Sequence, residues 1–173
     1  MTARSDPPGG EPASGFEDPR LDTETPLRPG NAAAAIIVVR GRYLLQLRDM
    51  KRGIFFPGHW GCFGGGVERG ESPDEALLRE LDEELGLRPA RADVVLFTRF
   101  EFGLGFNGLA PVWRSFYELE LAEDDAARLD FAEGSGMRLC PREAILAATI
   151  PLTPYDAFAL WLHINRRRLA GRD

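Results

Sequence analysis

The chain has 173 residues, 44% of them hydrophobic and 28% charged, which is the composition of an ordinary globular domain. A domain of this size buries enough surface to fold without disulfides or a structural metal, so the disulfide-stapled miniproteins are excluded. With 21 Lys and Arg against 27 Asp and Glu, the formal net charge is −6, which argues against a protein that binds nucleic acid through its phosphates.

Membrane and secretory segments are not expected. The longest apolar run, residues 32–39, is far too short for a membrane helix, and the first ten residues lack the apolar core of a secretory signal. We therefore expect a cytoplasmic protein without a membrane partner. The two cysteines, Cys62 and Cys140, lie outside any C-x-x-C spacing, and we expect both to be reduced thiols.

The amino-terminal third of the chain divides into a tail and the start of a domain. Residues 1–30 are rich in Pro and Gly and poor in apolar residues, so we expect a disordered tail, with a single folded domain over 31–173. Residues 32–39, AAAAIIVV, form a continuous apolar run typical of a buried central strand. A second strand is predicted over 43–48.

A long loop and a well-marked helix follow. Residues 49–66 contain too much Gly and Pro for regular structure until near Trp60, and they indicate a functional loop. Ser72 is a suitable N-cap with Glu75 as its capping-box partner, and Gly86 can end the helix. The spacing predicts a helix over 73–85.

The remaining elements alternate between strands and helices. We expect strands over 93–102 and 111–121 joined by a hairpin turn at Asn107-Gly108, a short strand over 137–140, a short helix over 141–148 and a longer helix that begins at Thr153-Pro154 and carries an apolar stripe of Phe158, Trp161, Leu162 and Leu169. Strands with interspersed helices indicate the α/β class, with helices on both faces of a sheet.

Three carboxylates share one stripe of the predicted helix. At about 100° per residue, Glu80, Glu83 and Glu84 lie together beside a leucine stripe, and like charges at this spacing repel each other. Arg79 can pair with Glu83 but cannot neutralise all three glutamates. A hard cation such as Mg²⁺ or Mn²⁺ prefers oxygen ligands, so the stripe predicts a metal platform.

The spacing of these residues resembles a known motif. Gly65, Glu71 and the run RELDEELGL over 79–87 match the complete Nudix box. The resemblance implies a Nudix-type α/β/α sandwich with a mixed β-sheet between helices. It also implies hydrolysis of a nucleoside diphosphate linked to another moiety, with Mg²⁺ or Mn²⁺ as the cofactor.

The resemblance also assigns roles residue by residue. The metal ligands it implies are Glu80, Glu83, Glu84 and the Gly64 carbonyl, and the pair that fixes the loop to the helix is Glu71 with Arg79. The candidates for a catalytic base that accepts the proton of the attacking water are Glu80, the loop residue Glu68, and Glu133 from outside the box. For Glu68 and Glu133 the alternative is an ordinary exposed loop position.

The glycine loop and its flanks supply candidates for substrate binding. Phe56 and Trp60 can stack on a nucleobase, although packing into the core is the common fate of such rings. Arg48 can contact a phosphate or form a surface ion pair. Gly65 and Gly66 lack side chains, which lets a phosphate or metal approach the backbone.

The substrate stays open at this stage. About sixteen positions past the box lie Phe102, Gly103 and Leu104, and none is the proline of ADP-ribose hydrolases or the tyrosine of dinucleoside polyphosphate hydrolases. We prefer a nucleoside triphosphate, which includes oxidised ones, over a nucleotide sugar or ADP-ribose. A nucleotide-sensing module without catalysis is the second alternative. The expected partner is a small nucleotide, and the protein is expected to be a monomer or a homodimer.

Overall fold

The computed structural model describes residues 27, 29–103, 105, 108 and 110–171. Most of the predicted tail over 1–30, and Asn107 of the predicted hairpin turn, lie outside these residues. The described elements are β1 (Ala32–Val39), β2 (Arg42–Leu47), β3 (Trp60–Gly61), α1 (Pro73–Leu85), a short 3-10 turn (Arg91–Asp93), β4 (Val95–Phe102), β5 (Val112–Glu120), α2 (Glu123–Ala126), β6 (Gly136–Pro141), α3 (Arg142–Leu146) and α4 (Pro154–Leu169). The predicted helices and strands are confirmed to within a few residues at their ends, whereas α2 and the 3-10 turn, which contains Asp93, were not predicted.

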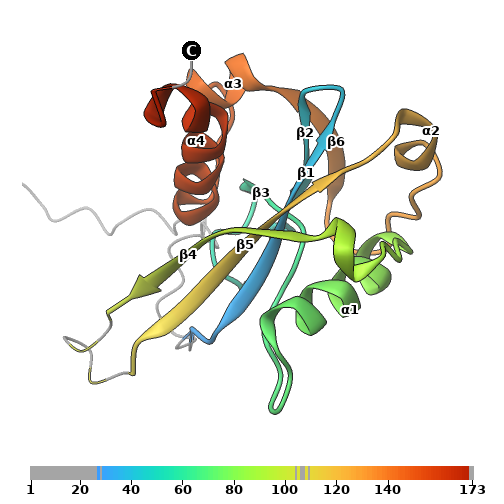
Figure 1. Cartoon of the computed structure of the whole chain (residues 1–173). Coiled ribbons are helices and arrows are strands. Elements are labelled where there is room, and N and C mark those ends of the chain that lie inside the picture. Colours follow the sequence, from blue (N-terminus) through green and yellow to red (C-terminus); the bar gives the residue numbers. More distant parts are fainter. Residues whose placement is uncertain (1–26, 28, 104, 106–107, 109, 172–173) are drawn as a thin grey trace, which may run out of the picture.

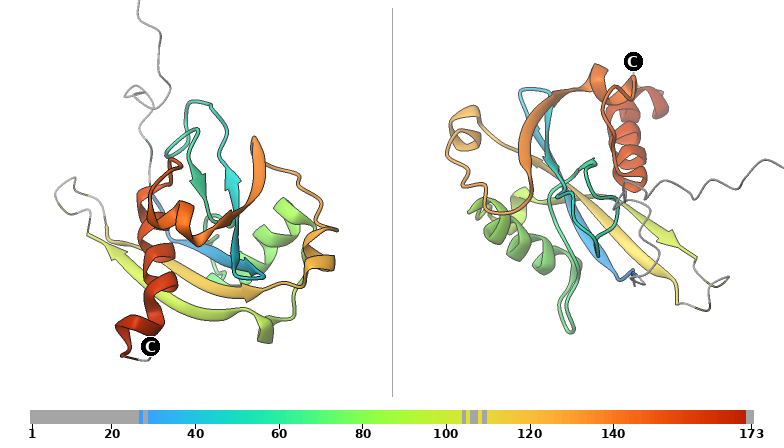
Figure 2. Two further views of the ribbon diagram at one scale, coloured as in Figure 1. Left: turned by 90° about the horizontal axis from the view of Figure 1, so that it is seen from above. Right: turned by 180° about the vertical axis from the view of Figure 1, so that it is seen from behind.

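The strands form one mixed sheet with helices on both faces (Figure 1). The order is β3-β2-β1-β5-β4, and β6 pairs with β2. β1 and β5 run parallel, and the other pairs are antiparallel. Figure 2 shows α1 and α4 on opposite sides of the sheet. The expected α/β/α sandwich is confirmed.

Strand β1 is buried on both faces because each face has its own core. Ala33, Ala35 and Ile37 belong to the cluster under α1, while Ala34 and Ile36 belong to the cluster under α4. Side chains alternate between the two faces of a strand, so a continuous apolar run is what a central strand between two helical layers requires.

Helix α1 begins and ends at its predicted residues. The Ser72 amide donates to the Glu75 carboxylate over 2.9 Å, which completes the capping box. Gly86 adopts a left-handed conformation at φ +60°, and its amide donates to the Asp82 carbonyl over 2.9 Å. Leu77, Leu81 and Leu85 are buried in the core, which sets the direction in which the glutamates of the same helix point.

The predicted apolar stripe of α4 does not face the core. Phe158 and Trp161 are exposed and stack on each other with centroids 6.2 Å apart, and Leu169 is exposed as well. The buried face carries Asp156 and His163 beside the small or branched residues Ala159 and Leu160. Asp156 accepts from the Cys62 amide at 2.9 Å and pairs with Arg114 at 3.0 Å, so the buried Asp156 carboxylate is hydrogen-bonded on both oxygens.

Two further expectations concern the cysteines and membrane-spanning helices. Cys62 and Cys140 are both free and buried. Within the part of the chain that the structure describes, every helix is too short or too polar to traverse a lipid bilayer.

Candidate active site

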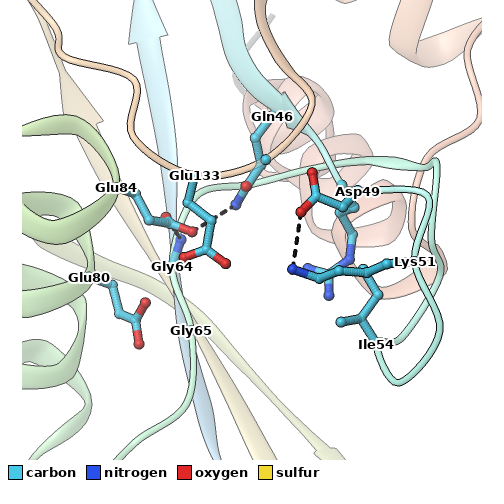
Figure 3. Close-up of a pocket in the computed structure, with 11 residues that line it drawn as sticks. Gln46, Asp49, Lys51, Ile54, Gly64, Gly65, Glu80, Glu84 and Glu133 are labelled. Carbon is cyan, nitrogen blue, oxygen red and sulfur yellow. Dashed lines mark hydrogen bonds and ion pairs between the residues drawn. The ribbon is translucent and has the colours of Figure 1, made fainter.

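A pocket opens where the glycine loop meets α1 and the ends of two other loops (Figure 3). Its volume is about 200 Å³, and it is lined by Gln46, Arg48, Asp49, Lys51, Ile54, Gly64, Gly65, Glu80, Glu84, Glu133 and Gly134. One wall carries the carboxylates of α1 and Glu133. The other wall belongs to the loop that follows β2.

The glycine loop lies against β1 at the base of the pocket. The Ala33 and Ala35 amides donate to the Gly65 and Phe63 carbonyls at 3.0 and 2.9 Å. Gly64 lies between them at φ +126°, and a Cβ there would collide with the Ala33 carbonyl. Only glycine fits this position. A Cβ on Gly65 would collide with the Glu80 carboxylate, so Gly65 allows α1 to approach the loop.

Glu84 is the buried carboxylate of the pocket. Only 5% of the residue is exposed, and its two oxygens accept from the Gly64 amide at 2.9 Å and from the Gln46 side-chain amide at 3.2 Å. Burial raises the pKa of Glu84 to about 7 against these two hydrogen bonds, and the charges of Glu80 and Glu133 raise it further. Both donors to Glu84 among the described residues are therefore neutral, and no ion pair to its carboxylate occurs within this part of the chain.

Arg79 binds the other carboxylates of the motif. Its guanidinium donates to both oxygens of Glu71 at 3.0 and 3.2 Å, to Glu80 at 2.9 Å and to Glu83 at 3.2 Å. It also donates to the Gly66 carbonyl at 3.0 Å. The Glu71 carboxylate in turn accepts from the Glu68 amide at 3.0 Å. The expected pair between loop and helix is thus present, with Arg79 at its centre.

The structure brings two of the three box glutamates, and not Glu83, to the pocket. Glu83 is exposed and does not line the pocket, because on the helix it lies roughly 100° away from the buried Glu84. Among the described residues, no three His, Cys, Asp or Glu side chains are grouped closely enough to hold a metal as they stand. Two glutamates of the box, Glu80 and Glu84, face the pocket.

Glu133 joins these two glutamates from a different loop. Residues 130–135 are held at both ends: the Ala132 amide donates to the Glu84 carbonyl at 2.9 Å, and the Ser135 amide donates to the Leu47 carbonyl at 2.8 Å. Figure 3 shows the Glu133 carboxylate beside that of Glu84. Glu133 therefore lines the pocket and is at the same time an exposed loop residue, so its position is compatible with both sequence hypotheses for it.

The carboxylates on the α1 side of the pocket, here called the acidic wall, are the type of ligand that a divalent cation prefers. Glu80, Glu84 and Glu133 offer carboxylate oxygens, and burial raises the pKa of Glu80 as it does that of Glu84. A carboxylate desolvated beside other carboxylates is stabilised by a nearby positive charge, and hard oxygen donors suit small divalent cations. The Phe63 and Gly65 carbonyls accept hydrogen bonds from backbone amides of β1. Within the described chain, the Gly64 carbonyl accepts no backbone hydrogen bond.

The opposite wall supplies the positive charge of the pocket. Lys51 pairs with Asp49 over 3.0 Å, and Asp49 also accepts from the Ser135 hydroxyl at 2.8 Å. These contacts tie the loop after β2 to the loop that carries Glu133. Arg48 lines the pocket too, although its Nε donates to the Phe55 carbonyl at 2.7 Å, so one edge of its guanidinium already supports the loop.

Besides Glu83, four further residues that were predicted as catalytic or substrate-binding lie outside the pocket. Glu68 is exposed outside the pocket, and its backbone amide rather than its carboxylate is bound to Glu71. Phe56 packs edge-on against His59 and Tyr155. The Trp60 ring packs against the core cluster under α4, and the Arg138 guanidinium lies over its face. Gly66 lies beyond the pocket as an acceptor for Arg79. The two rings do not line the pocket, because Phe56 lies against Tyr155 at the start of α4 and Trp60 packs against the core cluster that includes Ala159 and Leu160.

The pocket also contains residues that the sequence did not single out. Gln46, Asp49, Lys51 and Ile54 come from β2 and the loop that follows it, and Gly134 comes from the loop after Glu133. Of these residues, Gln46 could have been recognised from the sequence, because a polar residue within the otherwise apolar strand YLLQL indicates a buried hydrogen-bonding group. Lys51 had no such signal within a polar loop.

Comparison with known protein families identifies the class. A family model for the NUDIX domain matches residues 28–160. The chain therefore belongs to the Nudix family, in agreement with the sequence motif and with the mixed sheet between helices. Divalent metals are general cofactors in this family.

Curated relatives match over a part of their length. The chain is 47% identical over 62 residues to the nucleoside triphosphatase NudI of Enterobacter sp. (strain 638), covering 36% of this chain and 43% of that protein. It is 42% identical over 72 residues to NudI of Salmonella arizonae, covering 42% and 50%. The matched segment thus spans about half the length of these relatives.

Solved structures match over most of the chain. The Escherichia coli ORF135 protein has 26% identity and a TM-score of 0.62, with 83% of this chain and 94% of that one covered. A MutT NUDIX hydrolase from Burkholderia pseudomallei has 26% identity and a TM-score of 0.59, with 77% and 96% covered. The NUDIX domain of Shewanella oneidensis NrtR, solved with ADP ribose, shares the fold at 17% identity and a TM-score of 0.62, with 81% and 90% covered.

Proposed function

We propose that this protein hydrolyses a pyrophosphate bond of a nucleoside triphosphate with Mg²⁺ or Mn²⁺ as cofactor. The observation that carries the proposal is the two-sided pocket, with Glu80, Glu84 and Glu133 on one wall and Lys51 on the other. An acidic wall suits a divalent cation, and a basic wall suits the phosphates that the cation does not cover. A triphosphate chain has the charge and length to contact both walls.

The residues of the pocket have three roles in this proposal: cation binding, positioning of the glycine loop and proton transfer. Glu80, Glu84 and the Gly64 carbonyl would hold the cation, which when bound polarises the phosphate oxygens and lowers the pKa of water. Arg79 donates to both Glu80 and Glu83, so the cation would share Glu80 with the guanidinium, whereas Glu83 is exposed outside the pocket and is not one of these ligands as it stands. Arg79 and Glu71 keep the glycine loop against α1, so the oxygen donors retain their places. Glu133 accepts the proton of the attacking water, because its carboxylate faces the pocket and has no basic partner among the described contacts.

The substrate class rests on two lines of support. The curated relatives are named nucleoside triphosphatases, and their matched segments share 42–47% identity with this chain. The pocket is polar and open rather than an apolar slot for a second nucleoside, with Ile54 as its only large apolar side chain within the described lining. Both observations favour a triphosphate over a nucleotide sugar or ADP-ribose.

A hydrolysis panel tests the proposal. Purified full chain would be incubated with Mg²⁺ or Mn²⁺ and a set of nucleoside triphosphates, oxidised triphosphates, nucleotide sugars and ADP-ribose, with products identified by mass spectrometry. We expect release of pyrophosphate and a nucleoside monophosphate, or of phosphate and a diphosphate, from triphosphates. Hydrolysis of a sugar nucleotide or ADP-ribose alone would contradict the substrate class. Thermal stabilisation by nucleotide without any product would instead indicate a sensing module.

Lys51 offers a test of the basic wall. Replacing Lys51 by methionine removes the charge while keeping the length of the side chain. We expect KM for the triphosphate to rise roughly 3- to 10-fold, since one exposed charge contact is worth about 1 kcal/mol, while kcat stays close to the wild-type value. Steady-state kinetics at saturating metal measure both constants. Arg128→Met is the matched control, because Arg128 pairs with Asp125 on an exposed surface outside this pocket; an unchanged KM in Lys51→Met would argue against the contact.

A further inference from the structure

Glu84 is held by one backbone group and one side chain. The Gly64 amide donates to Oε2 at 2.9 Å and the Gln46 Nε2 donates to Oε1 at 3.2 Å. Among the described residues, Gln46 is the only side chain that contributes a hydrogen bond to this carboxylate. The position of the Gly64 amide follows from the path of the glycine loop. Gln46 is therefore the side chain whose replacement changes the hydrogen bonding of Glu84.

Gln46 is itself rigidly placed. It is 4% exposed on β2, where it pairs with Gly61 of β3 and with Met137 of β6. Its Nε2 donates both to Glu84 and to the Cys62 carbonyl at 3.3 Å, so the amide cannot flip without losing both bonds. The donor therefore stays directed at one oxygen of Glu84.

The charge of the donor distinguishes Glu84 from the neighbouring glutamates. Arg79 donates to Glu80 and Glu83 with a guanidinium, which compensates their charge. Gln46 is neutral and therefore orients Glu84 without compensating it. A carboxylate has about four lone-pair sites, so with one hydrogen bond on each oxygen both oxygens keep a site for a cation.

We propose that Gln46 is a positioning residue that holds Glu84 in place for a divalent cation while leaving its charge available. The inference rests on the proposed metal-dependent function. Hydrogen-bonding partners behind a metal ligand fix its orientation, and their loss typically weakens metal affinity roughly 10- to 100-fold. Gln46 thereby links β2 to the ligand on α1.

Gln46→Met tests the inference, because methionine is unbranched and of similar volume but has no donor. Mn²⁺ affinity, measured by electron paramagnetic resonance on the full chain without nucleotide, is expected to fall roughly 10- to 100-fold. At saturating Mn²⁺, KM for the triphosphate is expected to stay at the wild-type value while kcat falls. Tyr43→Phe is the matched control, since it removes one hydrogen bond from the same strand, to His163, outside the pocket; its Mn²⁺ affinity should equal that of the wild type.

The outcomes separate the two proposals. A folded Gln46→Met protein that binds Mn²⁺ as tightly as the wild type overturns the role of Gln46, whereas a wild type that neither binds Mn²⁺ nor hydrolyses triphosphates overturns the proposed function and this inference with it. If Gln46→Met does not fold, ¹⁵N-labelled wild type provides the test. Substoichiometric Mn²⁺ should broaden the Gln46 side-chain amide signals and spare those of Asn165, which lies on α4; sharp Gln46 signals would overturn the inference.

Discussion

Replacing Glu84 by glutamine is expected to reduce turnover roughly 10²- to 10³-fold or more and to stabilise the protein without metal. Turnover falls because Glu84 is the buried carboxylate that would hold the cation, and such electrostatic contributions are worth several kcal/mol. Stability rises because burial raises the pKa of Glu84 to about 7, which means that the ionised form is unfavourable in the folded state. Glutamine removes that ionisation.

The sign of this effect with pH follows from linkage. The folded protein holds the Glu84 proton more tightly than the unfolded chain, whose glutamates titrate near pH 4.5. The wild type therefore loses stability as the pH rises from about 4.5 to about 7, whereas the variant does not lose this contribution. At pH 8 we expect Glu84→Gln to be more stable on the order of 1–2 kcal/mol, since the amide gives up about one hydrogen bond as an acceptor.

Chemical denaturation of both proteins between pH 4.5 and 8, in a chelating buffer, measures this difference. Asp82→Asn is the matched control, because Asp82 lies on the same helix and pairs with Arg88 at the surface. The control should keep both turnover and the wild-type pH dependence. Wild-type turnover in Glu84→Gln would refute the role assigned to Glu84, and a difference in stability that does not grow with pH would refute its electrostatic cause.

Replacing Arg79 by alanine is expected to lower turnover roughly 10²-fold or more and to lower the melting temperature. The guanidinium joins Glu71, Glu80, Glu83 and the Gly66 carbonyl, so its loss removes the cation bound to three carboxylates and leaves the Gly64–Glu84 bond to hold the glycine loop against α1. A displacement of about 1 Å in a reacting group can by itself cost 10²-fold in rate. Arg79→Lys should recover little, because an ammonium cannot reproduce the fork that binds Glu71 through two oxygens.

Turnover and thermal melting of Arg79→Ala, Arg79→Lys and Arg88→Ala would check this expectation. Arg88 also forms an ion pair with a carboxylate of α1, but at the exposed end of the helix, so its removal should change neither quantity. If Arg79→Lys kept full activity, the multiple contacts of Arg79 would not be required. If Arg88→Ala lost as much as Arg79→Ala, the effect would belong to the helix as a whole and not to the loop.

Helix α1 and the family membership were accessible from the chain because their signals are local. Ser72, Glu75 and Gly86 mark the ends of the helix within a few residues of chain, and the box runs continuously from Gly65 to Leu87. The run of apolar residues in β1 likewise reports burial on both faces without knowledge of the partners.

The composition of the pocket was less accessible, because it depends on contacts between distant segments. The sequence placed Glu80, Glu83 and Glu84 on one stripe, but the core packing of Leu77, Leu81 and Leu85 turns Glu84 inward and leaves Glu83 in solvent. Glu133 reaches the same pocket only because the backbone of its loop bonds to the ends of α1 and β2.

The difference between local signals and long-range contacts also applies to two aromatic residues. Phe56 and Trp60 precede the glycine loop in the chain, which made them candidates for stacking on a nucleobase, although packing into the core is the common fate of such rings. Contacts with α4 instead hold both rings outside the pocket lining, Phe56 against Tyr155 and Trp60 against the core cluster under α4. Local patterns in the chain thus settled the helix, the central strand and the family. Tertiary packing alone decided which carboxylates meet and which side chains face them, because those contacts join residues from separate strands, loops and helices.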